Sequence, residues 1–308
     1  MSTTPAPFIV AAAQHSPVFM NREESVAKAC GIIDEAAKAG AKPVVFPEAF
    51  IPAYPDWVWV LRSSDSMALN GLYRELLENA VTIPDESTDR LREAARSAGI
   101  HVAIGVNERN GEGSGASLLN TLLYISNRGE ILGAHRKLMP TGGERTVWGQ
   151  GDGSSLLSFE TTVGKLGGLL CWENYMPLAR QAIYQMGVQI HVAPTWDSGE
   201  PWLLAMRHIA REGGMYVVNC CQAIRIDEIP DRYEFKANYP EGREWVNPGN
   251  SCIVDPTGKV IAGPAKGTQE ILYAEVDLGL IPAAKRMFDA AGHYARPDVF
   301  RFHVNRRG

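Results

Sequence analysis

Three residues whose side chains could carry out nucleophilic catalysis each close an apolar run that is typical of a buried strand. They are Glu48, Lys137 and Cys171. If the three strands run in the same direction in one sheet, their ends meet at one edge, where α/β folds hold their sites. A carboxylate in an apolar pocket can take the proton of a thiol, and an ammonium group can stabilise negative charge on the attacked substrate. The set predicts covalent catalysis by a cysteine.

The stretch around Cys171 carries the strongest signal. An apolar strand gives way there to polar and aromatic residues, Trp172, Glu173 and Asn174, and Pro177 follows. This pattern predicts that Cys171 lies between a strand and a helix, with Asn174 as the helix cap and Pro177 in the first turn. Backbone N–H groups of such a turn can lower the pKa of a thiol and stabilise a developing anion. The alternative is a buried core cysteine, and the polar residues that follow argue against it.

Glu48 and Lys137 would each be ordinary if they stood alone. A glutamate after a strand is most often a surface residue, and a lysine at the end of a strand is most often a solvated charge at a sheet edge. The prediction therefore rests on finding all three residue types at corresponding places.

Composition and charge indicate an ordinary globular protein. The chain has 308 residues, of which 45% are hydrophobic and 21% charged, and its net charge is -5. This length allows a large core, and the absence of a basic stretch excludes nucleic acid and an anionic membrane surface as expected partners. The N-terminus has neither the basic residues of a signal peptide nor an apolar stretch that could span a bilayer.

The five cysteines are odd in number and include no C-x-x-C pair. This usage argues against a disulfide framework and a structural zinc site, and it favours a reducing, cytoplasmic compartment. Cys220 and Cys221 lie in an apolar run and are expected to be core thiols. His191, His208 and His293 are expected to be structural, and no cluster of acidic residues and histidines has metal-ligand spacing, so no metal is expected.

The elements that must position these residues follow from periodicity and turn signals. Strands are expected at 8–14, 42–48, 101–106, 120–126, 131–137, 156–159, 165–171, 188–193, 215–221, 250–254, 259–262 and 271–277. Helices are expected at 22–40, 67–79, 87–98, 176–186, 202–211 and 280–288. Hairpins mixed with strand–helix–strand units predict an α/β fold of two mixed sheets packed face to face with helices outside. No linker divides the chain, so residues 1–308 are expected to form a single domain.

Two loops are expected to wall a cavity. The stretch 50–59 is rich in proline and aromatic residues, and 140–153 is long and dense in glycine, as functional loops often are. The candidate wall residues are aromatic: Tyr54, Trp57, Trp172 and Trp196. They weakly favour an apolar or aromatic substrate, and ordinary packing or a subunit contact is the alternative.

Three separated motifs resemble the signatures of the nitrilase superfamily of carbon-nitrogen hydrolases, in the right order and within a likeness that runs from Phe8 to Phe300. The motifs are Phe46-Pro47-Glu48, His135-Arg136-Lys137-Leu138-Met139-Pro140-Thr141 and Cys171-Trp172-Glu173-Asn174. Two further segments resemble the true nitrilase branch, namely Glu144-Arg145-x-x-Trp148-Gly149-x-Gly151-Asp152 and the tail Gly292-His293-Tyr294-Ala295-Arg296-Pro297-Asp298. The segment after Asp197 is short compared with some relatives, so the resemblance does not predict which residues form this part of the pocket wall.

The resemblance implies a role for each matched residue. Glu48 is the general base, Lys137 stabilises charge, Cys171 is the nucleophile, and Glu144 is a second carboxylate that positions substrate or water. The reaction implied is hydrolysis of an organic nitrile to a carboxylic acid and ammonia, through a thioimidate and an acyl-thioester, with no organic cofactor. The fold implied is a four-layer αββα sandwich that forms a homodimer or a larger homo-oligomer, such as a spiral, with the tail of about 281–308 in subunit contacts.

Other functions stay open at this point. The same three residues can cleave amides, so an amidase or carbamoylase is one alternative, and a cyanide-degrading enzyme is another. A non-catalytic assembly protein with this fold would be expected to have lost one of the three residues, and none is lost. Fast turnover of an amide without turnover of the matching nitrile would favour the amidase.

Overall fold

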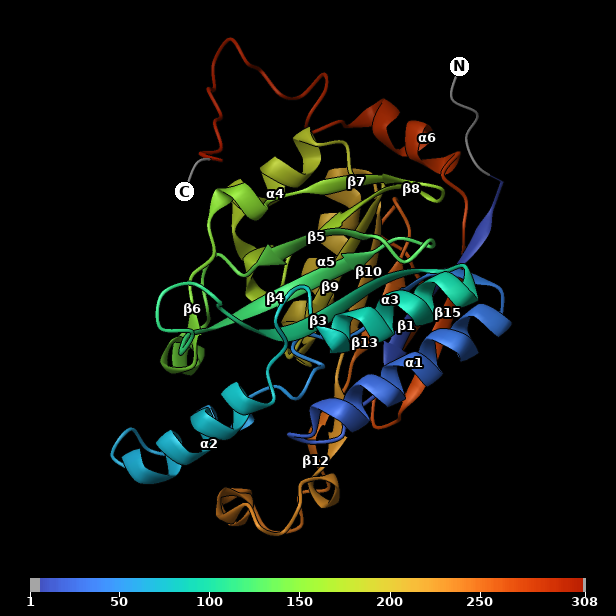
Figure 1. Cartoon of the computed structure of the whole chain (residues 1–308). Helices are drawn as coiled ribbons and strands as arrows, with labels where there is room; N and C mark the ends of the chain where they lie inside the picture. The colour runs from blue at the N-terminus through green and yellow to red at the C-terminus, as the bar shows by residue number, and fades with distance from the viewer. Residues whose placement is uncertain (1–5, 307–308) are drawn as a thin grey trace.

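The computed structural model describes residues 6–306. Two large β-sheets are stacked face to face with helices on both outer faces (Figure 1), and two further strands form a small separate sheet. The strands are β1 (Phe8–Gln14), β2 (Ala41–Val45), β3 (His101–Arg109), β4 (Leu118–Ile125), β5 (Ile131–Arg136), β6 (Trp148–Gly149), β7 (Ser158–Thr161), β8 (Gly164–Gly168), β9 (Ile190–Thr195), β10 (Tyr216–Cys221), β11 (Ala223–Arg225), β12 (Trp245–Pro248), β13 (Ser251–Val254), β14 (Val260–Ala265) and β15 (Glu270–Val276). The α-helices are α1 (Arg22–Lys38), α2 (Ser66–Glu78), α3 (Glu86–Ala98), α4 (Pro177–Gln185), α5 (Glu200–Gly213) and α6 (Leu280–Met287). None of these helices is long and apolar enough to cross a membrane.

The first sheet has the strand order β15-β1-β2-β3-β4-β5, with β6 beside β4, and the second has the order β14-β13-β10-β9-β8-β7. Both sheets mix parallel and antiparallel neighbours. In the first, β1, β2 and β3 are parallel and β4 is antiparallel to β3. In the second, β8, β9 and β10 are parallel and β13 is antiparallel to β10. The predicted αββα sandwich of two mixed sheets is confirmed.

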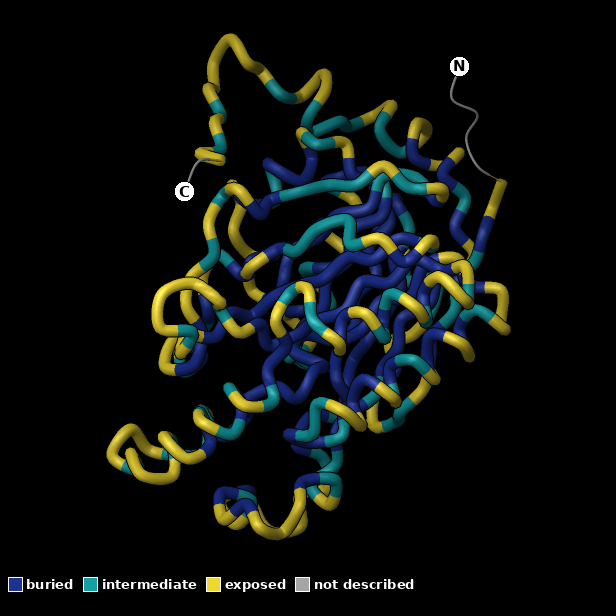
Figure 2. Tube along the Cα trace, viewed as in Figure 1, coloured by how far each residue is buried: buried dark blue, intermediate teal, exposed yellow. Residues whose placement is uncertain are grey.

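Alternation of side chains along the strands explains why the sheets stack. In β1, Val10 and Ala12 face the core between the sheets, whereas Ala11 and Ala13 face α1 and α3. The same alternation in β10 sends Val218 inward and its neighbours outward, toward α4 and α5. Each sheet is therefore apolar on both faces, and Figure 2 shows the resulting buried interior flanked by partly exposed helices.

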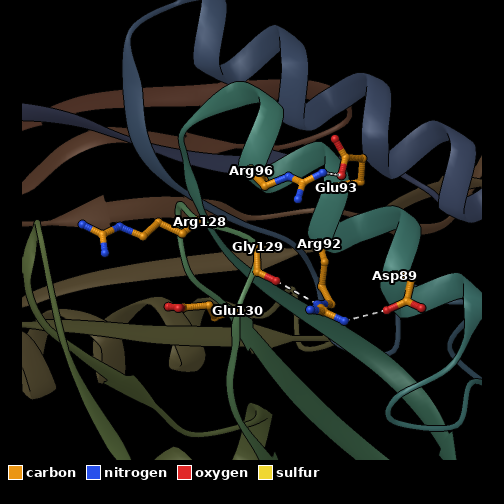
Figure 3. A pocket seen from close by; sticks show the side chains of 7 residues that line it. All are labelled: Asp89, Arg92, Glu93, Arg96, Arg128, Gly129 and Glu130. Atoms are coloured by element: carbon orange, nitrogen blue, oxygen red, sulfur yellow. Dashed lines mark hydrogen bonds and ion pairs between the residues drawn. The ribbon is translucent and has the colours of Figure 1, made fainter.

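The turn between β4 and β5 lies against α3, as the close view in Figure 3 shows. Arg92 of α3 donates from Nε to the carbonyl oxygen of Gly129 at 2.7 Å and pairs with Asp89 at 2.7 Å. Gly129 has a φ of 77°, and a Cβ there would lie 2.6 Å from the Arg92 carbonyl oxygen. Only glycine allows this close approach. The predicted turn at 127–130 is confirmed, and its geometry fixes the register of β5, which leads to Lys137.

The strands that lead to the three candidate residues do not share one sheet. Glu48 and Lys137 follow β2 and β5 of the first sheet, whereas Cys171 follows β8 of the second. β2 and β5 run in the same direction, because β2 is parallel to β3 and both β3 and β5 are antiparallel to β4. The prediction of a single sheet edge is therefore wrong for Cys171, which reaches the site from the facing sheet.

Two excursions extend beyond the sandwich at the lower end of Figure 1, one containing α2 and the other running from β11 to β12. Apolar side chains from both pack into one cluster, which includes Tyr54, Trp57, Leu76 and Phe235. At the opposite end of the molecule, Phe302 and Val304 of the tail pack against the apolar cluster under α4 and α5.

Candidate active site

Lys137 lies at the centre of the candidate site, between two carboxylates. Its Nζ is 2.7 Å from Glu48 Oε1 and 2.7 Å from Glu144 Oε2, and all three side chains are buried. Burial by itself would lower the pKa of Lys137, but the negative charges around it outweigh this effect and raise the pKa. The lysine is therefore a fixed cation in a dry site.

Glu48 is held by a turn that packs closely on β3. The next residue, Ala49, has a φ of 50°, and a Cβ on Gly105 would lie 2.4 Å from the Ala49 nitrogen. Asn120 Nδ2 donates to Glu48 Oε1 at 2.8 Å, while Oε2 has no hydrogen-bond partner among the described residues. Burial raises the pKa of Glu48, and Lys137 opposes that increase. A buried carboxylate oxygen with a free lone pair and a raised pKa suits a proton acceptor.

Glu144 lies in a short 3-10 helix (Gly142–Thr146) of the loop that was predicted to wall a cavity. Its Oε1 accepts a hydrogen bond from Tyr54 OH at 2.7 Å, and its Oε2 accepts one from the Thr141 backbone N–H at 2.7 Å. Both oxygens of Glu144 are thus occupied, counting the ion pair with Lys137, which fixes the carboxylate in place.

Cys171 follows β8 and begins a 3-10 helix (Cys171–Tyr175), with a φ of 48° that non-glycine residues rarely adopt. Its side chain is buried, and Thr195 Oγ1 lies 3.2 Å from its Sγ. Burial raises the pKa of the Cys171 thiol, the charge of Glu48 adds to the increase, and Lys137 only partly offsets it. Cys171 is thus buried, although the polar residues after it argued against simple burial, and the donors of the turn do not lower the pKa of its thiol. Desolvation exceeds the effect of nearby donors.

Asn174 is not the helix cap that the sequence predicts. It is buried, and its Nδ2 donates to the carbonyl oxygens of Leu169 at 3.0 Å and Cys171 at 2.9 Å. His191 Nε2 lies 2.6 Å from Asn174 Oδ1, and burial lowers the pKa of His191 to about 3, so this histidine is neutral and structural as predicted. Pro177 does stand in the first turn of α4. Asn174 thus fixes the backbone on both sides of Cys171.

The structure adds a buried ion pair that was not predicted from the sequence. Glu173 accepts hydrogen bonds from the backbone N–H groups of Leu138 at 2.6 Å and Leu170 at 2.7 Å, and it pairs with His135 Nε2 at 2.9 Å. Leu138 adjoins Lys137 and Leu170 adjoins Cys171, so one carboxylate ties together the two strand ends that carry them. The signal in the sequence was the placement of a histidine two residues before Lys137 and a glutamate two residues after Cys171.

Replacing Glu173 with glutamine is expected to lower the free energy of unfolding by about 3 kcal/mol, because it removes the partner of a buried charge. Urea denaturation near pH 6 measures this loss. The exposed Glu160→Gln variant is the control and should change stability by less than about 0.5 kcal/mol. A loss in Glu173→Gln no larger than in the control would contradict the role of this ion pair.

The pH dependence of this ion pair follows from the two pKa shifts. Burial alone would lower the pKa of His135, but the charge of Glu173 outweighs it and raises that pKa above 6.5. Burial alone would raise the pKa of Glu173, but His135 and the backbone donors outweigh it and lower that pKa below 4.5. The contribution of the pair is thus fully present between pH 4.5 and 6.5. It declines as the pH falls through the lowered pKa of Glu173 or rises through the raised pKa of His135.

A cavity of about 460 Å³ opens onto Cys171. It is lined by Tyr54, Trp59, Thr141, Gly142, Glu144, Cys171, Trp172, Trp196 and Asp197. Three predicted wall residues therefore line the cavity, and their binding of substrate remains a prediction. Trp57 does not line it: its ring packs against Phe19 and Phe235, and Trp59, two residues on, takes its place. Among residues 6–306, no group of three or more histidine, cysteine or acidic side chains could hold a metal ion.

Comparison with known proteins places this geometry in context. Residues 9–286 match the family model described as carbon-nitrogen hydrolase. The chain is 40% identical to an aliphatic nitrilase of Sinorhizobium fredii, covering 97% of this chain and 96% of that protein. It is 39% identical to nitrilase 1 of Arabidopsis thaliana, covering 95% and 85%. It is also 40% identical to a bifunctional nitrilase/nitrile hydratase of Lupinus angustifolius, covering 94% and 84%.

Solved structures share the fold. Nit3 of Saccharomyces cerevisiae, a member of branch 10 of the nitrilase superfamily, superposes with a TM-score of 0.74 at 21% identity, covering 94% of this chain and 96% of that one. An amidase from Nesterenkonia superposes with a TM-score of 0.64 at 18% identity, covering 89% and 92%.

Proposed function

The chain belongs to the carbon-nitrogen hydrolase family, and we propose that within this family it is a nitrilase, which converts an organic nitrile and two waters to a carboxylic acid and ammonia. The observation that carries the proposal is the buried Glu48–Lys137–Glu144 group beside a cysteine that opens onto an aromatic cavity. The curated relatives of about 40% identity over most of the chain support the nitrile as substrate.

We assign the first step to Glu48 and Cys171. Because both burial and Glu48 raise the pKa of the thiol, a free thiolate is scarce, and proton transfer to Glu48 accompanies attack. The sulfur bonds to the nitrile carbon, and one π electron pair moves to nitrogen. Lys137 and the backbone N–H of Trp172 stabilise this developing anion, which takes up the proton and gives a thioimidate.

Two waters complete the reaction. Glu48 accepts a proton from the first, whose oxygen bonds to the thioimidate carbon, and the protonated nitrogen leaves as ammonia with formation of an acyl-thioester. The second water adds to the thioester carbon, the carbon–sulfur bond breaks, and the acid leaves with the thiol restored. In this scheme Glu144 orients Lys137 and the incoming water, since its oxygens are fixed by Tyr54 and Thr141.

The covalent intermediate provides the test. After a brief pulse of nitrile and acid quenching, intact-mass measurement should show one adduct per chain, at the mass of the thioimidate or the acyl-thioester. Cys171→Ala should show none, whereas Cys252→Ala, which removes another buried thiol, should keep it. An equal adduct on Cys171→Ala would remove this residue from its role. Turnover of the matching amide without turnover of the nitrile would assign an amidase instead.

We further propose that the protein is a cytoplasmic homo-oligomer. Large apolar side chains are exposed on the outer face of α4 and α5 and on the tail, including Leu178, Leu204 and Phe300, and a second copy would cover them. The five cysteines are free thiols, which supports a reducing compartment.

A further inference from the structure

The charges around the cavity are unbalanced. Two of its lining residues, Glu144 and Asp197, are carboxylates, and no lysine, arginine or histidine is among the lining residues. Lys137 lies behind the lining, where it is shared by Glu48 and Glu144. With both glutamates ionised, the buried group carries a net charge of -1, and Asp197 adds another, so the field in the cavity is negative.

Asp197 has no cationic partner among the described residues. Its Oδ2 accepts from Trp172 Nε1 at 2.9 Å, and its Oδ1 accepts from the Gly199 backbone N–H at 2.8 Å. Both donors are neutral, and no described lysine, arginine or histidine lies within 4.0 Å of its carboxylate. The Asp197 backbone N–H donates to Thr195 Oγ1 at 2.9 Å, the hydroxyl that also contacts Cys171. The carboxylate is thus held in place in the wall of the cavity onto which Cys171 opens.

Four aromatic residues line the same cavity as Asp197. Tyr54 and Trp196 stack with ring centroids 4.2 Å apart and planes within 5°. Trp59 and Trp172 line the same cavity and are about half exposed. The faces of tryptophan and tyrosine rings attract cations, especially alkylated ammonium groups, and a nearby carboxylate adds to this attraction.

From this arrangement we propose that the cavity selects nitriles that carry a cationic ammonium group remote from the nitrile carbon, and that Asp197 is the residue that sets this preference. The inference rests on the proposed nitrilase function and names its substrate class. An anionic nitrile of the same shape is disfavoured, because it meets two carboxylates and no basic group in the cavity lining.

Three benzonitriles of matched shape test the proposal. They bear at the para position a trimethylammoniomethyl group, its neutral isostere neopentyl, or a sulfonatomethyl group, which is a tetrahedral anion, and the methylene in each separates the ring from the charged or branched centre. Ammonia release gives kcat/KM for each. We expect kcat/KM for the cation to be about tenfold higher than for the neutral compound, because the cation gains an attractive contact in a partly solvated site. We expect kcat/KM for the anion to be about tenfold lower than for the neutral compound, because the anion meets a repulsive contact.

The nitriles differ in intrinsic reactivity, and this difference cancels when the ratio of their kcat/KM values is compared between variants. In Asp197→Asn the ratio of cation to neutral compound should fall about fivefold relative to the parent. The control Glu160→Gln, which removes an exposed carboxylate on β7, should leave the ratio unchanged. In the parent alone, the ratio should also fall as salt is raised from ~0.02 M to ~0.5 M, a test that needs no variant.

The outcomes separate this inference from the proposed function. Hydrolysis of all three nitriles with the same ratios in the parent and in Asp197→Asn, or with ratios that do not respond to salt, would overturn the cation preference and leave the nitrilase standing. Absence of both turnover and a covalent adduct with any of the nitriles would overturn the nitrilase itself.

Discussion

Replacing Lys137 with methionine is expected to reduce kcat/KM for a nitrile by about 10⁴-fold or more and to lower the free energy of unfolding by about 3–5 kcal/mol. Both effects have one cause. Lys137 is the only cation that contacts Glu48 and Glu144 among the described residues, and each contact is 2.7 Å. Methionine fills a similar volume and leaves two buried carboxylates facing one another. Ammonia release and urea denaturation measure the two losses.

A second substitution separates the stability effect from the catalytic one. In Lys137→Met with Glu48→Gln, one of the two facing carboxylates becomes neutral, so we expect the double variant to regain about 1–2 kcal/mol of stability and no activity. If Lys137→Met alone were as stable as the parent, the buried group would not depend on its cation, and our account of the site would be wrong.

Replacing Glu48 with glutamine is expected to lower kcat/KM by about 10⁴-fold while changing stability by less than about 1 kcal/mol. Glutamine keeps the shape of the side chain and an oxygen to accept from Asn120, but it cannot accept a proton. Stability changes little because Lys137 keeps its ion pair with Glu144. The same adduct experiment provides the control: a Glu48→Gln protein that still formed the adduct at the rate of the parent would exclude Glu48 as the base.

The pH profile adds a signature for Glu48. Since burial raises its pKa above 4.5, the acid limb of kcat/KM should lie above pH 4.5, because the base must be ionised to act. The folded state binds the Glu48 proton more tightly than the unfolded state does. Rising pH therefore changes the free energy of unfolding through Glu48 in the direction opposite to its change through Glu173. Between 4.5 and the raised pKa of Glu48, rising pH lowers the free energy of unfolding, and Glu48→Gln should lack this slope.

Much of the fold could be predicted because local patterns determine it. The apolar run of β1, the spacing of buried residues along α1 and the turn at 127–130 all appear in the structure within two or three residues of their expected bounds. These signals are local in the chain. The assignment of β8 to the second sheet is not, because an apolar strand buried on both faces carries no mark of the sheet that it joins.

The features of the site that were not predicted from the sequence also depend on packing. Trp57 and Trp59 are both aromatic residues in one short helical turn (Asp56–Trp59), and only packing decides which of them faces the cavity. The raised pKa of Cys171 was not predicted, because a sequence shows the donors near a thiol but not the depth of its burial. Asn174 looked like a helix cap because asparagine favours caps, whereas the structure uses it to hold the carbonyl oxygen of Cys171.

The carboxylate that accepts from both Leu138 and Leu170 has a consequence for engineering. Glu173 links the ends of β5 and β8, which belong to different sheets. The distance between Cys171 and Lys137 therefore depends on the spacing of the two sheets. Thermostabilising substitutions in the apolar interior, far from any reacting atom, should therefore also extend the working temperature range of the catalyst. Directed evolution could then pursue durability in the interior and selectivity at the cavity mouth as independent design problems.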